Sequence, residues 1–444
     1  MLDTEQMLAL AQDLLAAARR EGADAADVVL GQSASTRVAV RGGALEDVSR
    51  DEGESLTLRA FFGQRVASSA TPDFSKAALD ALAARVVAMA RAVPEDAFSG
   101  LAPEDLLLRG APPALDLCDA TNPSPEALRD AALRAEAAAQ AVKGVTNTDS
   151  ASASAAHSRT ALVTSHGFAG CADSSSFGIT ASVIAGTGSA MQRDYGWHTA
   201  RHHADLSSAE AIGALAGERA TARLGAAPIT GGAMPVVFDP RVGSGLLGHL
   251  IGALSGAAIA AKTSFLKDAL GTSLFGPDIV ITDDPHRLRG LGSRSYDGEG
   301  LPTKPLNIID QGNLTSFLID STAARQLGCA PTGHATRGGG VSSSNLALEP
   351  GQATPAELMA DIKQGLYVIE LIGQGVNLLT GDYSRGAAGF LIENGVITRP
   401  VNQVTVAGNL RDMFRALIPA DDLVYRYATN APTLRIDGMT VAGS

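Results

Sequence analysis

The pattern of apolar and polar positions predicts helices and antiparallel strands that alternate along the first half of the chain. Met7, Leu10, Leu14 and their neighbours recur at helical spacing, and they predict a first helix that Thr4 caps. Period-two alternation follows and predicts short antiparallel strands at 28–30, 36–40, 45–48 and 55–62.

Helices and a strand-rich stretch complete the predicted N-terminal domain. Residues 72–90 and 126–142 are rich in alanine, and each range predicts a helix. Between residues 145 and 203, alternating Ser, Thr, Ala and Val with glycine breaks predicts a meander of strands. Ser207 and Glu210 have the spacing of a capping box for a last helix that ends near residue 224. We therefore expect an α/β domain over residues 1–224, with antiparallel strands and flanking helices.

The second half of the chain predicts a different balance of elements. A Pro/Gly segment at 225–234 separates it from the first half, and an apolar, glycine-rich helix is expected at 246–261. Strands and hairpins follow, and the clearest hairpin turns at Asn394-Gly395, a pair that tolerates positive φ at both positions of a type I′ turn. The chain is therefore expected to be α+β, with a C-terminal domain over residues 225–444 dominated by a curved or barrel-like antiparallel sheet.

Composition narrows the classes of function. Of the 444 residues 45% are hydrophobic but only 4% aromatic, and 48 are glycine, so the core must consist of aliphatic side chains with backbones in close approach. The net charge is −12 without a long run of Lys or Arg, which argues against a nucleic-acid partner. The three cysteines have no CxxC spacing, the start MLDTEQ is unlike a signal peptide, and no apolar run reaches the ~20 residues of a membrane span. We expect a cytoplasmic protein that binds no membrane.

Two groups of side chains are candidates for a metal site. His198 and His202, with His203 beside them, would share one face of a helix, but the surroundings predict a strand, on which they would lie far apart. Asp283 and Asp284 with His286 could bind a divalent cation, although a turn that ends a strand is the simpler interpretation.

A polar segment at residues 381–386, GDYSRG, lies between two apolar runs and has glycine at both ends. As a loop it is a candidate for substrate binding, since Asp382, Tyr383, Ser384 and Arg385 offer donors and acceptors and Gly386 admits a close peptide backbone. A local turn in which Asp382 pairs with Arg385 is the structural alternative, worth ~0 to 1 kcal/mol if the pair is exposed.

The same segment begins a set of motifs that resembles the PmbA/TldE family, the "modulator of DNA gyrase" proteins. Around it stand GDYSRGAAGF (381–390), ENG (393–395) and VAGNL (406–410). Further similar motifs are GLPT (300–303), IIDQGNL (308–314), ARQLG (324–328), TGH (332–334), ELIGQG (370–375), VAVRGGALE (38–46) and LRAFFGQRV (58–66). The resemblance covers nearly the whole chain and is most specific in the last hundred residues.

The resemblance implies a role in proteolysis without a zinc site in this chain. In the related subunit TldD, the corresponding helix has a sequence that resembles LLHExxxHG. Two histidines of this motif bind zinc and its glutamate activates water. Aligned on the Leu-Leu pair before it, these positions are Gly248, His249 and Ala253 here, so all three functional residues are missing. The resemblance thus implies no cofactor in this chain, a zinc-bearing TldD-like partner, and unfolded or extended peptides as substrates, including antitoxins and peptide antibiotics.

Three hypotheses follow from the sequence. The first is a non-catalytic subunit of a heterodimeric zinc metalloprotease. The second is a peptide-binding or scaffold homodimer without proteolytic activity. The third is an independent metal-dependent hydrolase with its metal at His198 and His202.

Overall fold

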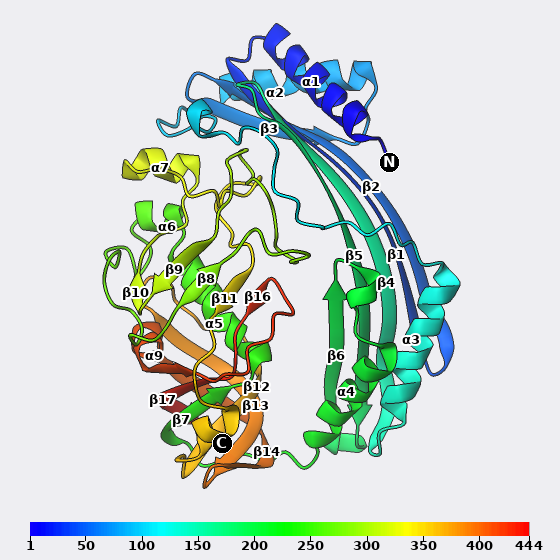
Figure 1. The fold of residues 1–444 in the computed structure, drawn as a ribbon, viewed down its shortest axis with the longest axis vertical. Helices are drawn as coiled ribbons and strands as arrows, with labels where there is room; N and C mark the ends of the chain where they lie inside the picture. Colours follow the sequence, from blue (N-terminus) through cyan, green and yellow to red (C-terminus); the bar gives the residue numbers. More distant parts are fainter. Residues whose placement is uncertain (444) are drawn as a thin grey trace.

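The computed structural model describes residues 1–443, and its N-terminal region is built on one long antiparallel sheet. The strand order is β3-β2-β1-β4-β5-β6, and the sheet arches along one side of the C-terminal region (Figure 1). Its strands are β1 (Ala25–Arg41), β2 (Ala44–Phe62), β3 (Arg65–Thr71), β4 (Val145–Thr164), β5 (Ala169–Ala185) and β6 (Gln192–Ala200).

Two pairs of helices cover this sheet at its opposite ends. The helices are α1 (Thr4–Arg20), α2 (Lys76–Ala92), α3 (Pro125–Gln140) and α4 (Ala209–Ala222). In the first pair, α1 packs on β1 and β4 and α2 packs on β2 and β3; in the second pair, α3 packs mainly on β4 and β1 and α4 on β5 and β6. The N-cap of the first helix is Asp3 and not Thr4, because the Asp3 carboxylate accepts the backbone N–H of Gln6 and the Gln6 side chain bonds back to Asp3.

Small residues let α3 and α4 pack with their backbones in close contact. A side chain at Gly213 would overlap the carbonyl group of Ala135, and one at Gly217 would come within 2.9 Å of the Ala139 carbonyl oxygen. The core between these helices and the sheet is aliphatic and alanine-rich. The close backbone approach that the composition predicts is therefore confirmed.

The C-terminal region contains a closed five-stranded barrel. The strands follow the order β14-β13-β12-β7-β17, and the barrel closes because β14 also pairs with β17, from Thr405 opposite Ala442 to Ala407 opposite Thr440. Its strands are β7 (Gly232–Phe238), β12 (Gln364–Ile372), β13 (Asp382–Glu393), β14 (Val396–Asn409) and β17 (Leu434–Ala442), and β15 (Leu417–Pro419) extends β17. The predicted α+β class and the barrel-like sheet are confirmed.

A second small sheet and five helices complete the region. The sheet has the order β10-β9-β8-β11-β16. Its strands are β8 (Ile281–Asp283), β9 (Leu306–Asp310), β10 (Asn313–Leu314), β11 (Leu346–Leu348) and β16 (Thr429–Asn430). The helices are α5 (Pro240–Ala253), α6 (Gly256–Ala260), α7 (Ser321–Leu327), α8 (Pro355–Met359) and α9 (Leu410–Ala416), and short 3₁₀ turns lie at Glu104–Leu106, Gly188–Ala190 and His203–Asp205.

Several predicted elements differ from those in the structure. The strands expected at 28–30 and 36–40 form one strand, as do those at 45–48 and 55–62, because β1 and β2 pair along their whole length as a hairpin. The helix expected at 246–261 is two helices, since α5 ends at Ala253 and Ser255 begins α6. The hairpin at Asn394-Gly395 is confirmed, with φ of 50° and 82° at its two turn residues. Within residues 1–443 no helix is long and apolar enough to cross a membrane.

Candidate functional site

Helix α5 presents a bare surface toward the space between the two regions. Asp239 caps it by accepting the backbone N–H of Arg241, and Pro240 stands at its first position. Gly245 and Gly248 are exposed on one face, and a Cβ added to either would meet no heavy atom within 4 Å. At Gly256, which belongs to α6, an added Cβ would lie 3.1 Å from the Leu318 carbonyl oxygen, so two backbones approach closely there.

The positions that correspond to the zinc motif do not form a metal site. Gly248 has no ligand atom, and Ala253 is fully buried. The His249 ring packs against the edge of the Tyr383 ring, and burial, with a smaller effect of the Arg385 charge, lowers the pKa of His249. No group of three or more His, Cys, Asp or Glu side chains in residues 1–443 is arranged to hold a metal ion. These residues do not fit zinc, which needs at least three converging ligands.

The GDYSRG segment is a strand and not the predicted loop. Its residues begin β13 and pair with β14, from Asp382 opposite Asn409 to Gly386 opposite Thr405. On the other side the Ser384 N–H donates to the Gly375 carbonyl at 2.6 Å, and Asp382 accepts from the Asn377 N–H at 2.9 Å. The backbone of this segment is therefore bonded on both edges, and any ligand must be recognised by its side chains.

Among these side chains, Arg385 alone reaches the pocket described below. Tyr383 is 2% exposed, and burial raises the pKa of its hydroxyl to about 12. Asp382 accepts from Thr380 Oγ1 at 2.6 Å and from Asn409 Nδ2 at 3.3 Å. Ser384 is exposed, and Gly386 has an extended backbone with room for a Cβ 3.5 Å from Ile372 Cβ.

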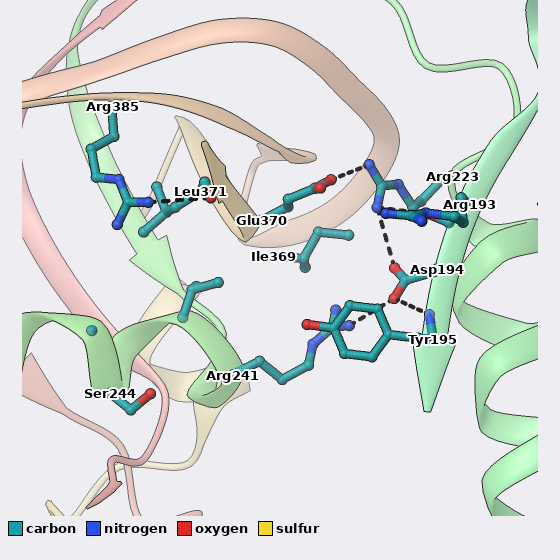
Figure 2. A pocket seen from close by; sticks show the side chains of 12 residues that line it. Arg193, Asp194, Tyr195, Arg223, Arg241, Ser244, Ile369, Glu370, Leu371 and Arg385 are labelled. Carbon is teal, nitrogen blue, oxygen red and sulfur yellow. Dashed lines mark hydrogen bonds and ion pairs between the residues drawn. The ribbon is translucent and has the colours of Figure 1, made fainter. Parts of the chain in front are cut away.

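A pocket of about 330 Å³ lies where the two regions meet (Figure 2). Strand β6 supplies one wall, and α5 with strands β12 and β13 supplies the other. Its lining residues are Arg193, Asp194, Tyr195, Arg223, Arg241, Val242, Ser244, Gly245, Ile369, Glu370, Leu371 and Arg385. Sequence reasoning found Arg385 but missed the others, because they come from separate segments that no local motif connects.

An ion-pair network joins the two regions across this pocket. Asp194 of β6, 3% exposed, accepts from Arg241 of α5 at 3.1 Å and from Arg223, which follows α4, at 3.4 Å. Arg223 also pairs with Glu370 of β12, and Arg241 pairs with Asp239. Figure 2 shows Asp194 between the two guanidinium groups. The network fixes β6 against the barrel region.

The other candidate histidines and acidic residues have separate structural partners. His198 Nδ1 accepts from the Ser207 N–H at 2.9 Å, whereas His202 Nε2 lies 3.2 Å from Asp116 Oδ1. His203 packs edge-on against Phe177. The structure does not bring these histidines together on one ion.

A turn ends β8 at Asp283, Asp284 and His286, which agrees with the simpler of the two interpretations of this segment. Asp283 accepts the Ser344 N–H at 2.7 Å and lies 3.1 Å from His334 Nε2. The Asp284 side chain accepts the His286 N–H at 2.9 Å. Each carboxylate thus has a partner within the loops around the small sheet.

Three family models match this chain in succession. They are described as PmbA/TldA metallopeptidase domain 1 (residues 26–90), central domain (118–224) and C-terminal domain (231–443). The protein named Metalloprotease PmbA from Escherichia coli O157:H7 is 36% identical over 423 residues, which cover 95% of this chain and 92% of that protein. The Metalloprotease PmbA homolog of Haemophilus influenzae is 32% identical over 430 residues, 96% of this chain and 94% of that protein. The chain belongs to the PmbA/TldD metallopeptidase family.

Solved structures share the fold over the whole chain. A Bacteroides thetaiotaomicron protein described as a modulator of DNA gyrase superposes with a TM-score of 0.93 at 28% identity and covers 100% of both chains. TldE from Thermococcus kodakarensis superposes with a TM-score of 0.85 and covers 98% of this chain and 100% of its own, but at 19% identity it supports the fold alone.

Proposed function

We propose that this chain is the zinc-motif-lacking subunit of a TldD/TldE-type heterodimeric metalloprotease that cleaves unfolded or extended peptides. The observation that carries the proposal is that α5 has no metal ligands at the positions of the zinc motif. Gly248, His249 and Ala253 stand where the zinc motif of a TldD-like chain would place its functional residues. Gly248 is exposed and has no side chain, His249 packs on Tyr383, and Ala253 is buried. A partner subunit then has to supply zinc and the group that activates water.

The contribution of this chain is to bind substrate and partner. The open face of α5 continues into the pocket that contains Ser244 and Arg385, so a peptide could lie along the glycines with its backbone close to the helix. Of the five residues in the substrate-binding hypothesis, Arg385 supplies the direct contact. Asp382, Tyr383, Ser384 and Gly386 support it by fixing the start of β13.

A TldD-like chain of the same family is the expected partner. The Metalloprotease TldD homolog of Haemophilus influenzae is 28% identical over 248 residues, 51% of this chain and 52% of that protein. A cytoplasmic location, and antitoxins or peptide antibiotics as substrates, stay predictions.

The experiment is to mix the purified chain with a TldD-like partner from the same source and to follow cleavage of an unstructured peptide. We expect no cleavage by this chain alone, co-elution of the two chains on size-exclusion chromatography, and cleavage by the complex that a zinc chelator abolishes. A chain that cleaves alone in a chelator-sensitive way would contradict the proposal. A chain that never co-elutes with its partner would favour the homodimeric scaffold. The separate partners of His198 and His202, Ser207 and Asp116, argue against the independent hydrolase.

A further inference from the structure

The charges around the pocket are unequal. Four arginines line it, Arg193, Arg223, Arg241 and Arg385, against two carboxylates, Asp194 and Glu370. Both carboxylates are already paired, Asp194 with Arg223 and Arg241 and Glu370 with Arg223. Arg193 turns outward to Asp149 at 3.3 Å and is 67% exposed.

Arg385 is the pocket arginine that has no carboxylate partner among the residues that the structure describes. No carboxylate in residues 1–443 lies within ion-pair distance of it, and its one hydrogen bond runs from Nη2 to the Leu371 carbonyl at a long 3.4 Å. Its Nε is buried without a hydrogen-bond partner. Figure 2 shows its guanidinium beside the Leu371 carbonyl, with no acidic side chain next to it. A half-buried guanidinium with unused donors is costly unless a ligand completes it.

We infer that this pocket binds a carboxylate of the peptide substrate and that Arg385 holds it, an inference that rests on the proposed function. The guanidinium fork matches the two oxygens of a carboxylate, and one unpaired positive charge suits one negative charge. The pocket volume of about 330 Å³ is at the small end for a ligand site, which suits the end or one side chain of a peptide. Gly245 leaves the approach along α5 open, and Ser244 adds a hydroxyl. The carboxylate can be the C-terminus of the peptide or an acidic side chain.

The test measures binding to the isolated chain by calorimetry, without partner or zinc. The probes are N-acetyl-penta-alanine with a free carboxylate, the same peptide as its C-terminal amide, and the amide with a central glutamate. We expect the free acid to bind roughly tenfold or more tightly than the plain amide, as a charge-assisted hydrogen bond would give. If the glutamate peptide matches the free acid, an acidic side chain serves equally well; if it matches the plain amide, the pocket selects the C-terminus.

Variants separate a direct contact from a structural role. Arg385→Gln should abolish the preference for the acid and leave the amide unchanged, and Arg385→Lys should retain part of the preference because it keeps the charge without the fork. Arg399→Gln, the same loss of charge at an exposed position on β14, is the matched control and should bind like the wild type.

An acid that binds no more tightly than its amide, or Arg385→Gln affecting both peptides equally, would overturn the inference. Neither result touches the proposed function, because the assembled protease can still cleave peptides without reading a carboxylate. A partner that restores no cleavage would refute the proposed function and leave the acid preference of this chain measurable.

Discussion

The edge of the Tyr383 ring rests on the His249 ring, with centroids 6.0 Å apart and planes inclined by 75°. This contact joins α5, which carries the positions of the missing zinc motif, to β13, which carries the most specific family motif. Burial keeps His249 neutral near pH 7 and leaves Tyr383 un-ionised, so the pair packs as two aromatic rings beside the Arg385 charge. His249 thus serves packing in this structure.

The first prediction is that the purified chain binds no stoichiometric zinc. Gly248 and Ala253 offer no ligand atom, and one histidine alone cannot provide the three ligands that a stable site needs. Elemental analysis after dialysis measures the zinc content directly. About one zinc per chain, lost when His249 or His202 is replaced, would contradict this prediction.

The second prediction concerns stability in mild acid. Burial lowers the pKa of His249 below its unfolded value of about 6.5, so the unfolded chain takes up a proton that the folded chain resists. The stability linked to His249 is therefore fully present above pH ~6.5 and is lost as the pH falls below it. His249→Gln should lose less stability than the wild type between pH ~7 and ~5.

Urea unfolding at several pH values measures this dependence. The comparison uses the change of the unfolding free energy with pH, so a constant packing cost of the substitution does not affect it. Burial also lowers the pKa of His198, so His198→Gln should flatten the profile in the same direction and the double variant should flatten it further. An unchanged slope in His249→Gln would show that the pKa of His249 is the same in the folded and the unfolded chain.

Local signals predicted those elements that are specified by neighbouring residues. Asn394-Gly395 specified its turn through positive φ at both residues. The same approach divided β2 into strands at 45–48 and 55–62, because the polar residues between them, Arg50, Asp51 and Glu52, belong to the strand only through their pairing with β1. It also predicted a loop at GDYSRG for the same reason.

Long-range features could not be predicted in this way. Barrel closure depends on β14 pairing with β17, and the pocket combines β6, α5, β12 and β13. The partners of Asp194, Arg223 and Arg241, follow it by 29 and 47 residues, so neither has the short spacing of a helical or hairpin pair. Of the residues that line the pocket, the sequence singled out Arg385 through its motif, and the absence of zinc ligands from this chain stays a prediction.

The third prediction is that Asp194→Asn destabilises the contact between the two regions. The change removes the charge shared by Arg223 and Arg241, whose side chains are 14% and 15% exposed, and a broken buried pair costs about 3–5 kcal/mol. Asp149→Asn is the control, since its pair with Arg193 is exposed and worth about 0–1 kcal/mol. Urea unfolding of both variants gives the difference, and equal small losses would mean that the network contributes little.

The last prediction compares two glycines of β13 that differ in their surroundings. A Cβ at Gly389 would overlap the Tyr367 carbonyl of β12, so Gly389→Ala must push two paired strands apart and should cost about 1–3 kcal/mol. Gly386 has an extended φ, and its Cβ would lie in ordinary contact, 3.5 Å from Ile372 Cβ, so Gly386→Ala should change the free energy of unfolding by less than about 0.5 kcal/mol. Thermal and urea unfolding of the two variants measure both free energies of unfolding. A Gly386→Ala variant as unstable as Gly389→Ala would mean that no space for a Cβ exists between β13 and β12 at Gly386.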